Sequence, residues 1–238
     1  MNLAPLAEAL QVTWPAKTVN TVGNWHIRDG AGAGRRASAA TPLGPVAEAD
    51  IDQAEKDMRK IPMPPLFAVR GDQPALEALL SARGYRDHDH SIYYAAPVER
   101  LAKSPPPPVT TFEIWPPLAI MEDIWRANDL AQPRIDLMQR ATCAKTALFG
   151  RTQNRAAGAA FVGAHNGYAL LHALVVDNDF RRSGLGQHLT VQAALWAQNQ
   201  GCHTLALAVS RDNNAALALY ASLGMEPVGE YHYRSLPE

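Results

Sequence analysis

The pattern of apolar and polar positions is clearest in the second half of the chain. The run Ala169–Val176 is apolar except at His172 and ends at Asp177-Asn178-Asp179, which predicts a buried strand followed by a turn. After the turn, apolar residues recur at spacings of four, four and three, which predicts a helix with one buried stripe, ending near Gln200. The residues of this stripe are Leu185, Leu189, Ala193 and Trp196.

The same pattern predicts the other elements of residues 110–238. Strands are expected near Thr111–Ile114, Lys145–Arg151, Ala157–Ala164, Thr204–Val209 and Gly229–Ser235. Helices are expected at Leu118–Asp129, Pro133–Ala141 and Ala215–Ser222, and a hairpin turn at His165-Asn166-Gly167. This α/β order places hairpin strands before the buried strand, unlike the repeated βαβ units of a dinucleotide-binding fold.

The first half gives fewer signals. Ala47–Lys60 and Pro74–Arg83 are predicted to be helical, and Phe67–Arg70 to be a strand. Trp25–Arg28 and Arg36–Pro42 are expected to pair as a hairpin around the glycine-rich residues 30–34. Because no helix is predicted directly after these glycines, we interpret them as a flexible hairpin tip rather than a phosphate-binding loop.

A proline run divides the chain. Ser104 is followed by four prolines, Pro105 to Pro108, which hold an extended conformation and cannot join a helix or a central strand. The sequence therefore predicts a first domain at residues 1–103, a linker at 104–109 and a second domain at 110–238.

The ends of the two halves resemble each other. Sliding the chain by 140 positions aligns them without a gap. Matched pairs include Val69 with Val209, Asp72 with Asp212, Leu79 with Leu219, Gly84 with Gly224 and Tyr93 with Tyr233. Both stretches read as strand, polar loop, helix, glycine stop and strand, and glycine suits the left-handed position that ends a helix. The repeat predicts two related domains.

Composition excludes several classes of protein. The chain is 47% hydrophobic with a formal net charge of -1, so nothing favours a nucleic-acid or membrane partner. It has no apolar run long enough to span a membrane and no export signal at its start, so we expect a cytoplasmic protein. Cys143 and Cys202 are expected to be reduced, buried residues. Monomer and homodimer both remain open.

The segment between the buried strand and the long helix, Arg181-Arg182-Ser183-Gly184-Leu185-Gly186, has the features of an anion-binding turn. Glycine lets the backbone approach a ligand that a Cβ would hold away. The first N–H groups of a helix lack internal partners and lie at the positive end of its dipole. A strand, a glycine turn and a helix N-terminus in this order predict a pyrophosphate site.

Two motifs resemble those of the GCN5-related N-acetyltransferase (GNAT) superfamily. Arg181-x-x-Gly184-x-Gly186 matches its acyl-CoA signature, usually written Q/R-x-x-G-x-G/A. The later Asn213-x-x-Ala216-x-x-Leu219-Tyr220-x-x-x-Gly224-Met225 is similar to its next motif, which usually ends in Gly-Phe. Asn178 stands where the superfamily usually has proline. The resemblance covers about residues 110–238 well.

For the fold, the resemblance implies an α/β (α+β) arrangement of two GNAT-like domains, each a mixed, mostly antiparallel sheet flanked by helices. The first domain is expected to be degenerate, because it has no R-x-x-G-x-G and because Leu80 aligns with Tyr220 and Gln73 with Asn213. It would shape the acceptor site or stabilise the second domain.

For binding, the resemblance implies acetyl-CoA as the acyl-donor cosubstrate and no metal. The CoA pyrophosphate would lie on the glycine turn and the start of the helix, at Arg181, Arg182, Ser183, Gly184, Leu185, Gly186 and Gln187. The strand end Leu174, Val175 and Val176 would separate from its neighbour and pair its backbone with the pantetheine arm. Asn213 would contact the same arm.

For catalysis, the resemblance implies that Tyr220 protonates the departing CoA thiolate, which suits a phenol that is protonated at neutral pH. A core aromatic residue is the alternative. His172 is the candidate general base because its pKa lies near neutrality, and a hydrogen-bonded core histidine is the alternative. Glu230, Tyr231 and Tyr233 are candidates for the acceptor pocket.

The sequence therefore predicts an N-acetyltransferase that moves an acetyl group directly from acetyl-CoA to a primary amine of a small molecule or peptide. The alternative is a non-catalytic acyl-CoA sensor, which needs the glycine turn but not Tyr220 or a base. A nucleotide-binding dehydrogenase is disfavoured, since no GxGxxG with an acidic partner occurs in one βαβ unit. The acceptor amine is not identified by the sequence.

Overall fold

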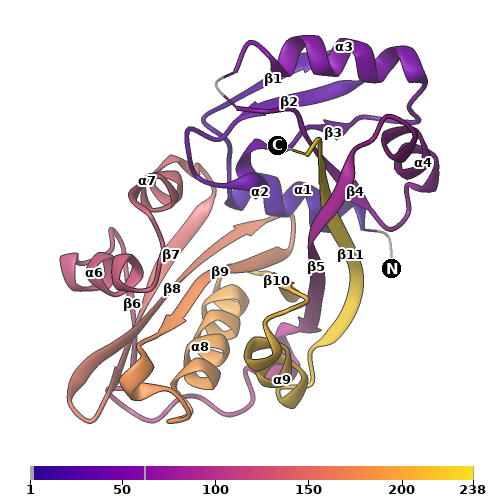
Figure 1. The fold of residues 1–238 in the computed structure, drawn as a ribbon. Coiled ribbons are helices and arrows are strands. Elements are labelled where there is room, and N and C mark those ends of the chain that lie inside the picture. Colours follow the sequence, from indigo (N-terminus) through magenta and orange to yellow (C-terminus); the bar gives the residue numbers. More distant parts are fainter. Residues whose placement is uncertain (1–2, 62, 238) are drawn as a thin grey trace.

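The structure, a computed structural model, describes residues 3–61 and 63–237 (Figure 1). Its strands are β1 (Thr18–Val22), β2 (Trp25–Asp29), β3 (Thr41–Pro42), β4 (Leu66–Arg70), β5 (Arg86–Pro97), β6 (Thr111–Ile114), β7 (Ala144–Thr152), β8 (Arg155–His165), β9 (Tyr168–Val176), β10 (Thr204–Ser210) and β11 (Glu226–Ser235). Its helices are α1 (Ala4–Thr13), α2 (Arg35–Ser38), α3 (Glu48–Met58), α4 (Pro74–Ala82), α5 (Val98–Leu101), α6 (Ala119–Ala127), α7 (Gln132–Arg140), α8 (Leu185–Asn199) and α9 (Asn214–Ser222), with a 3-10 turn, η1, at Asn178–Phe180.

The strands form two sheets. The small sheet has the order β1-β2-β3, and the large one has the order β4-β11-β5-β10-β9-β8-β7-β6. Strands β9 and β10 pair in parallel, and the other neighbouring strands of both sheets pair antiparallel. The predicted α/β class, with sheets flanked by helices, is confirmed: the large sheet is mixed and mostly antiparallel, and the small sheet is antiparallel.

The large sheet contains strands from both halves of the chain. The succession β4-α4-β5 repeats as β10-α9-β11, with each element displaced by about 140 positions, as the sequence repeat predicts. The first strand of each repeat pairs with the last strand of the other repeat: β10 pairs with β5, and β4 pairs with β11. The two final strands also pair with each other, and Ser91 faces Tyr231, its counterpart in the repeat. This contact therefore lies on a pseudo-twofold axis.

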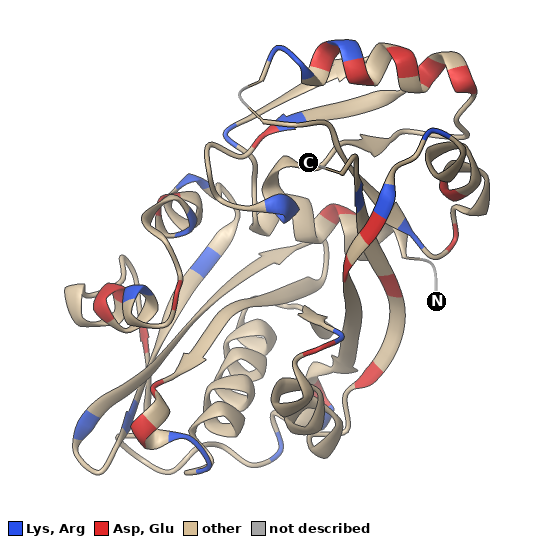
Figure 2. Ribbon diagram, in the orientation of Figure 1, with Lys and Arg blue, Asp and Glu red and all other residues tan. Residues whose placement is uncertain are grey.

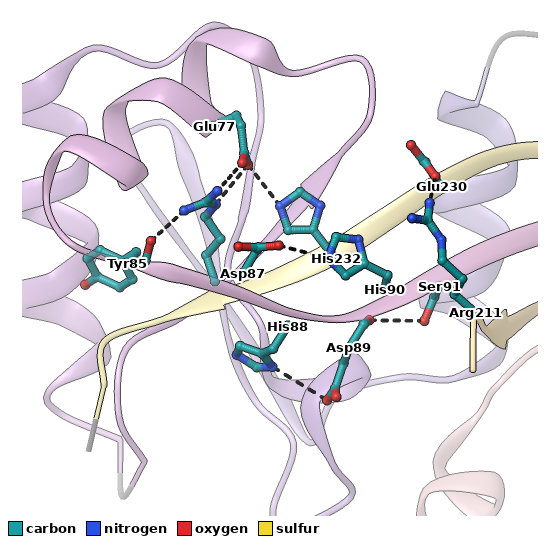
Figure 3. Close-up of polar contacts among 11 residues, drawn as sticks. Glu77, Tyr85, Asp87, His88, Asp89, His90, Ser91, Arg211, Glu230 and His232 are labelled. Atoms are coloured by element: carbon teal, nitrogen blue, oxygen red, sulfur yellow. Dashed lines mark hydrogen bonds and ion pairs between the residues drawn. The ribbon is translucent and has the colours of Figure 1, made fainter. Parts of the chain in front are cut away.

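A polar network fastens the exchanged strand β11 to the first half of the chain (Figure 3). Glu77 of α4 accepts hydrogen bonds from Arg234 and from His232, the latter at 2.9 Å. Burial opposes ionisation of Glu77, but these two partners outweigh it and lower the pKa of the carboxyl group. The ring of His232 stacks on that of His90 at 4.9 Å, and His90 bonds to Asp87 at 2.9 Å. Side chains that lie 142 to 157 positions apart in the sequence thus hold each other in place.

Helices cover both faces of the large sheet. On one face α8 and α9 pack over β7 to β10, and the predicted stripe of α8 is confirmed because its four residues are at most 5% exposed. On the other face α1 packs over β9, β10 and β11, and α6 and α7 cover the part towards β8. A separate core fills the space between the small sheet, β4, α3 and α4. The outer side of α3 carries both acidic and basic residues (Figure 2).

The prediction for the glycine-rich segment was wrong in two respects. Residues 35–38 form the short helix α2 instead of a strand, with Gly34 at a φ of 91° just before it. Strand β2 has β1 as its hairpin partner and meets only the two residues of β3 on its other side. The reason is local: Arg35 to Ser38 carry no β-branched residue, and the Ser38 hydroxyl donates to the Gly34 carbonyl at 3.0 Å.

The predicted linker lies between α5 and β6. This linker remains a proposed domain boundary along the chain. In space the two halves share one sheet, because β5 of the first half lies between β11 and β10 of the second. Both cysteines are free, with Cys202 buried and Cys143 only partly so. In the part of the chain that the structure describes, no helix is both long and apolar enough to traverse a bilayer.

The strand exchange predicts that neither half folds alone. We expect a fragment of residues 107–238, cut within the exposed proline run, to lose cooperative unfolding because β10 and β11 lose β5 and expose their edges. Co-expression of residues 1–106 with residues 107–238 should restore a one-to-one complex, seen by size-exclusion chromatography and circular dichroism. A monomeric 107–238 fragment with a cooperative thermal transition would contradict this.

Candidate functional site

The site is built around two parallel strands that separate. Strands β9 and β10 pair only from Tyr168 to Leu170 and from Thr204 to Ala206. Beyond these residues, Arg211 donates its N–H to the carbonyl of His90 in β5. Because the backbone groups alternate in direction along a strand, those of Ala208 and Ser210 point away from β5 and towards β9. These groups face a gap rather than a strand.

A β-bulge turns β9 away from β10. Ala159 is opposite Val175 whereas Phe161 is opposite His172, so β9 has one extra residue between these two pairs. Ala173 lies inside this interval with a φ of 50°, a left-handed conformation that costs a non-glycine residue about 1 kcal/mol. The buried Trp125 holds it there by donating its ring N–H to the Ala173 carbonyl at 2.9 Å.

The end of β9 directs backbone groups into the same gap. Asp177 donates its N–H to Ala157 of β8. Because backbone groups alternate in direction along a strand, those of Val175 face β8, and those of Leu174 and Val176 face away from it, into the gap. Arg181 confirms this orientation, since its Nε donates to the Val176 carbonyl at 3.3 Å. The predicted separation of this strand end from its neighbour is therefore present.

A cleft of about 1360 Å³ opens from this gap. That exceeds the range of about 300–1,000 Å³ typical of small-molecule sites, so it has room for an extended ligand and an acceptor. Its lining contains most residues predicted for the site: His172, Leu174, Val175, Val176, Arg181, Arg182, Gly184, Leu185, Gly186, Gln187, Asn213, Tyr220, Tyr231 and Tyr233. Ser183 and Glu230 are not part of it; Ser183 bonds back to Phe180 and Glu230 pairs with Arg211.

The predicted anion-binding turn leads directly into α8. Gly184 has a φ of 82° at the position before the helix, where its missing Cβ is required, and no side chain caps the helix there. A Cβ on Gly186 would lie 3.1 Å from the Leu219 side chain, so this glycine also lets α8 approach α9. Within the described residues, no hydrogen bond uses the N–H groups of Leu185, Gly186 or Gln187, which remain open to a ligand.

Asn213 and Tyr220 both belong to the α9 segment. Asn213 precedes the helix and its side-chain oxygen accepts the N–H of Ala216 at 3.1 Å, so its amide nitrogen is the group left for a ligand. Tyr220 is 6% exposed, and burial raises its pKa to about 12. Its hydroxyl has no partner among the described residues but is not sealed in the interior, because the residue lines the cleft.

His172 is a buried, neutral side chain. Its ring stacks on Trp14 at 4.9 Å, and burial, with the nearby charge of Arg36, lowers its pKa well below the usual value. Thr13 donates its hydroxyl proton to the Ala9 carbonyl at 2.8 Å, so at 2.9 Å from His172 it accepts the Nε2 proton. Nδ1 therefore carries a lone pair, and it has no partner within the described part of the chain.

Sequence reasoning missed Arg36, a basic residue that borders the gap. It lies on α2, donates Nε to the Tyr231 hydroxyl at 3.1 Å, and donates Nη2 to the Ala208 carbonyl at 3.2 Å. Burial raises the pKa of Tyr231, but Arg36 and hydrogen bonds from Tyr233 and Ser91 outweigh it and lower that pKa overall. Two adjacent arginines after glycines were the signal in the sequence, but only the fold brings them to the cleft.

Comparison with known families matches the middle and later part of the chain to a family model. The model of the acetyltransferase (GNAT) family matches residues 115–225, which include the separating strands, the glycine turn and Tyr220. Among curated proteins, the uncharacterized N-acetyltransferase YobR of Bacillus subtilis (strain 168) is 23% identical, over 93% of this chain and 94% of that protein.

Solved structures share the fold over the whole chain. A GCN5-related N-acetyltransferase from Kribbella flavida superposes with a TM-score of 0.77 at 18% identity, covering 100% of this chain and 96% of the other. A tandem GNAT protein from the clavulanic acid biosynthesis pathway gives a TM-score of 0.62 at 16% identity, covering 96% and 87%. The first half of the chain is thus part of the shared architecture.

The buried His172 predicts a loss of stability in mild acid. Because its folded pKa is depressed, the unfolded chain binds the proton first, so stability is complete above about pH 6.5 and falls as the pH drops below it. Within that window this one proton costs about 1.4 kcal/mol per pH unit. Urea unfolding between pH 8 and pH 5 should show a steeper loss for the wild type than for His172→Gln. Equal slopes would show that His172 does not titrate this way.

Proposed function

The chain belongs, through residues 115–225, to the acetyltransferase (GNAT) family, and on that premise we propose that it transfers an acetyl group from acetyl-CoA to a primary amine. One observation carries the proposal: the backbone groups of Leu174 and Val176 face an open gap beside the uncapped start of α8. A ligand with an amide-bearing arm and a pyrophosphate satisfies both sets of groups at once.

The residues present fit such a donor. The open N–H groups of Leu185, Gly186 and Gln187 suit the pyrophosphate, and Arg181 and Arg182 add positive charge at the same end of the cleft. The gap-facing groups of Leu174 and Val176 suit the amides of the pantetheine arm, which then takes the place of a strand. When bound, acetyl-CoA supplies an activated thioester, and these backbone and side-chain groups of the protein hold it in place.

The transfer needs a proton acceptor, an oxyanion partner and a proton donor. We assign His172 as the acceptor, acting through water on the ammonium group of the acceptor molecule, because its Nδ1 lone pair is unprotonated. The freed nitrogen lone pair forms the new C–N bond and the C–S bond breaks. The second proton that leaves the nitrogen replaces the one that the donor gives to the sulfur. We assign the Leu174 N–H, which faces the gap, as the donor to the negative charge that develops on the thioester oxygen.

Tyr220 is assigned to the leaving sulfur. Its raised pKa means that the phenol keeps its proton throughout the neutral range and can give it to the thiolate. Burial disfavours a thiolate for the same reason that it disfavours a phenolate, since both are anions. The pKa of the thiol is therefore raised beside Tyr220, and the sulfur accepts a proton more readily than in water. The first half of the chain lacks this chemistry, because Leu80 occupies the position that matches Tyr220.

The competing proposal is an acyl-CoA sensor without catalysis. It accounts for the glycine turn and the gap, but it gives no role to the unpartnered Tyr220 hydroxyl in the cleft. Both proposals require that acetyl-CoA raise the melting temperature and that NAD not do so, since a ligand stabilises the state that binds it.

The two proposals differ in the release of CoA. With a panel of amines, free thiol should appear at a rate that depends on the amine, and mass spectrometry should find the acetylated product. Tyr220→Phe should lower kcat by about a hundredfold, within the usual range for general acid catalysis, and leave the thermal shift with acetyl-CoA unchanged. Binding of acetyl-CoA with no amine-dependent thiol release would favour the sensor, and unchanged turnover in the variant would remove the role of Tyr220.

A further inference from the structure

Arg36 carries a positive charge that the described residues leave uncompensated. Its two hydrogen-bond acceptors are a phenol and a backbone carbonyl, and none of the ion pairs within the described ranges 3–61 and 63–237 involves it. The adjacent Arg35, by contrast, is paired with Asp89 at 2.6 Å. A guanidinium held in a partly enclosed place without an anion is costly, and an anionic ligand would relieve that cost.

The geometry leaves one side of this guanidinium available. Nε and Nη2 are engaged by Tyr231 and Ala208, whereas Nη1 has no hydrogen bond to any described residue and is not sealed in the interior. Arg36 is only partly buried and lines the cleft. Its two bonds fix the planar group, so Nη1 is presented to the cleft in a defined orientation.

A second cation stands on the same side of the cleft. Arg134 of α7 lies close to Gly34, since a Cβ built on that glycine would be 3.1 Å from the Arg134 guanidinium. Arg134 also lines the cleft, and it forms no ion pair within the described part of the chain. Two unpaired arginines, one from each half of the chain, therefore border the end of the cleft beside α2.

The position of Arg36 restricts where an anion lies relative to the reacting amine. Arg36 bonds to the Ala208 carbonyl, which faces the gap between β9 and β10. Under the proposed function, the amine must attack a thioester held in that gap. The anion and the amine of the acceptor are then neighbours, which fits two groups attached to one carbon.

We propose that Arg36 binds the carboxylate of the acceptor and that the acceptor is a free α-amino acid. This inference rests on the proposed acetyl transfer and adds the substrate class to it. Arg36 forms charge-assisted hydrogen bonds to the carboxylate, and Arg134 adds attraction from the same side of the cleft. Peptide N-termini and simple amines lack a carboxylate on the amine-bearing carbon and are poor acceptors.

Matched acceptors test the class directly. Leucine, leucinamide and isoamylamine share one side chain, and only leucine carries the carboxylate; phenylalanine, phenylalaninamide and phenethylamine form a second set. We expect KM for each amino acid to be about tenfold to a hundredfold below that of its amide or amine, as for the loss of hydrogen bonds to a charged group. The amine of the amide is less basic, so reactivity alone would favour the amide.

Variants test the residue. Arg36→Gln should raise KM for leucine by about tenfold or more relative to the KM that the same variant shows for leucinamide, while Arg36→Lys should recover part of the loss. Arg59→Gln is the control: Arg59 is exposed, pairs with Glu55 on α3 and lies outside the cleft lining. If Arg36 serves instead to ionise Tyr231 as a base, Arg36→Gln lowers kcat for leucine and leucinamide alike, and this overturns the proposal. Thermal unfolding identifies a variant that fails to fold.

Calorimetric binding with CoA in place of acetyl-CoA separates this inference from the proposed function. Leucine should bind the wild type in the presence of CoA, leucinamide should bind at least tenfold more weakly, and Arg36→Lys should reduce this difference. Leucine binding without any acetylation supports the carboxylate site and overturns the transferase proposal. Acetylation of amides and simple amines as efficiently as amino acids overturns the carboxylate site and leaves the transferase proposal standing.

Discussion

The separation of β9 from β10 is the constraint on which the rest of the structure depends. Two parallel strands that pair over three residues and then part leave backbone groups without partners in the middle of a sheet. Unpaired backbone groups in the interior are costly, so the gap persists only because other interactions hold its two sides apart. On the β9 side these are the bulge at Ala173 and the Trp125 hydrogen bond. The gap is therefore built into the fold before any ligand arrives.

On the β10 side the support comes from the first half of the chain. Strand β5 pairs with β10 along its whole length, from Thr204 opposite Pro97 to Ser210 opposite Ser91. Arg36 then satisfies the Ala208 carbonyl on the open side. The sequence predicts that the first half either stabilises the second half or shapes the site. In the structure it completes the sheet behind the gap, and it also forms the wall opposite the glycine turn.

What the sequence could predict was set by local patterns. The strand to Val176, the glycine turn and the helix from Leu185 have strong periodicity and turn chemistry, and they lie where predicted. The bulge was not predictable, because alanine at a positive φ leaves no mark in the sequence and is imposed by a tryptophan 48 positions away. The strand exchange and the place of Arg36 were equally hidden, since pairing between halves depends on tertiary contacts and not on local propensity.

The pseudo-twofold relation explains why only one half carries the anion site. Helix α3 corresponds to α8 when the chain is shifted by 140 positions, and Gly44 then falls on Gly184, while Val46 replaces Gly186. The start of α3 is already occupied by its own anions: Glu48 and Asp50 lie in the first turn, and Asp50 accepts the Ala47 N–H at 2.8 Å. A carboxylate there stabilises the helix and repels phosphate. In the first half, side chains of α3 therefore occupy the helix start that a ligand would need. This capping stabilises the first half, whose strand β5 supports the gap.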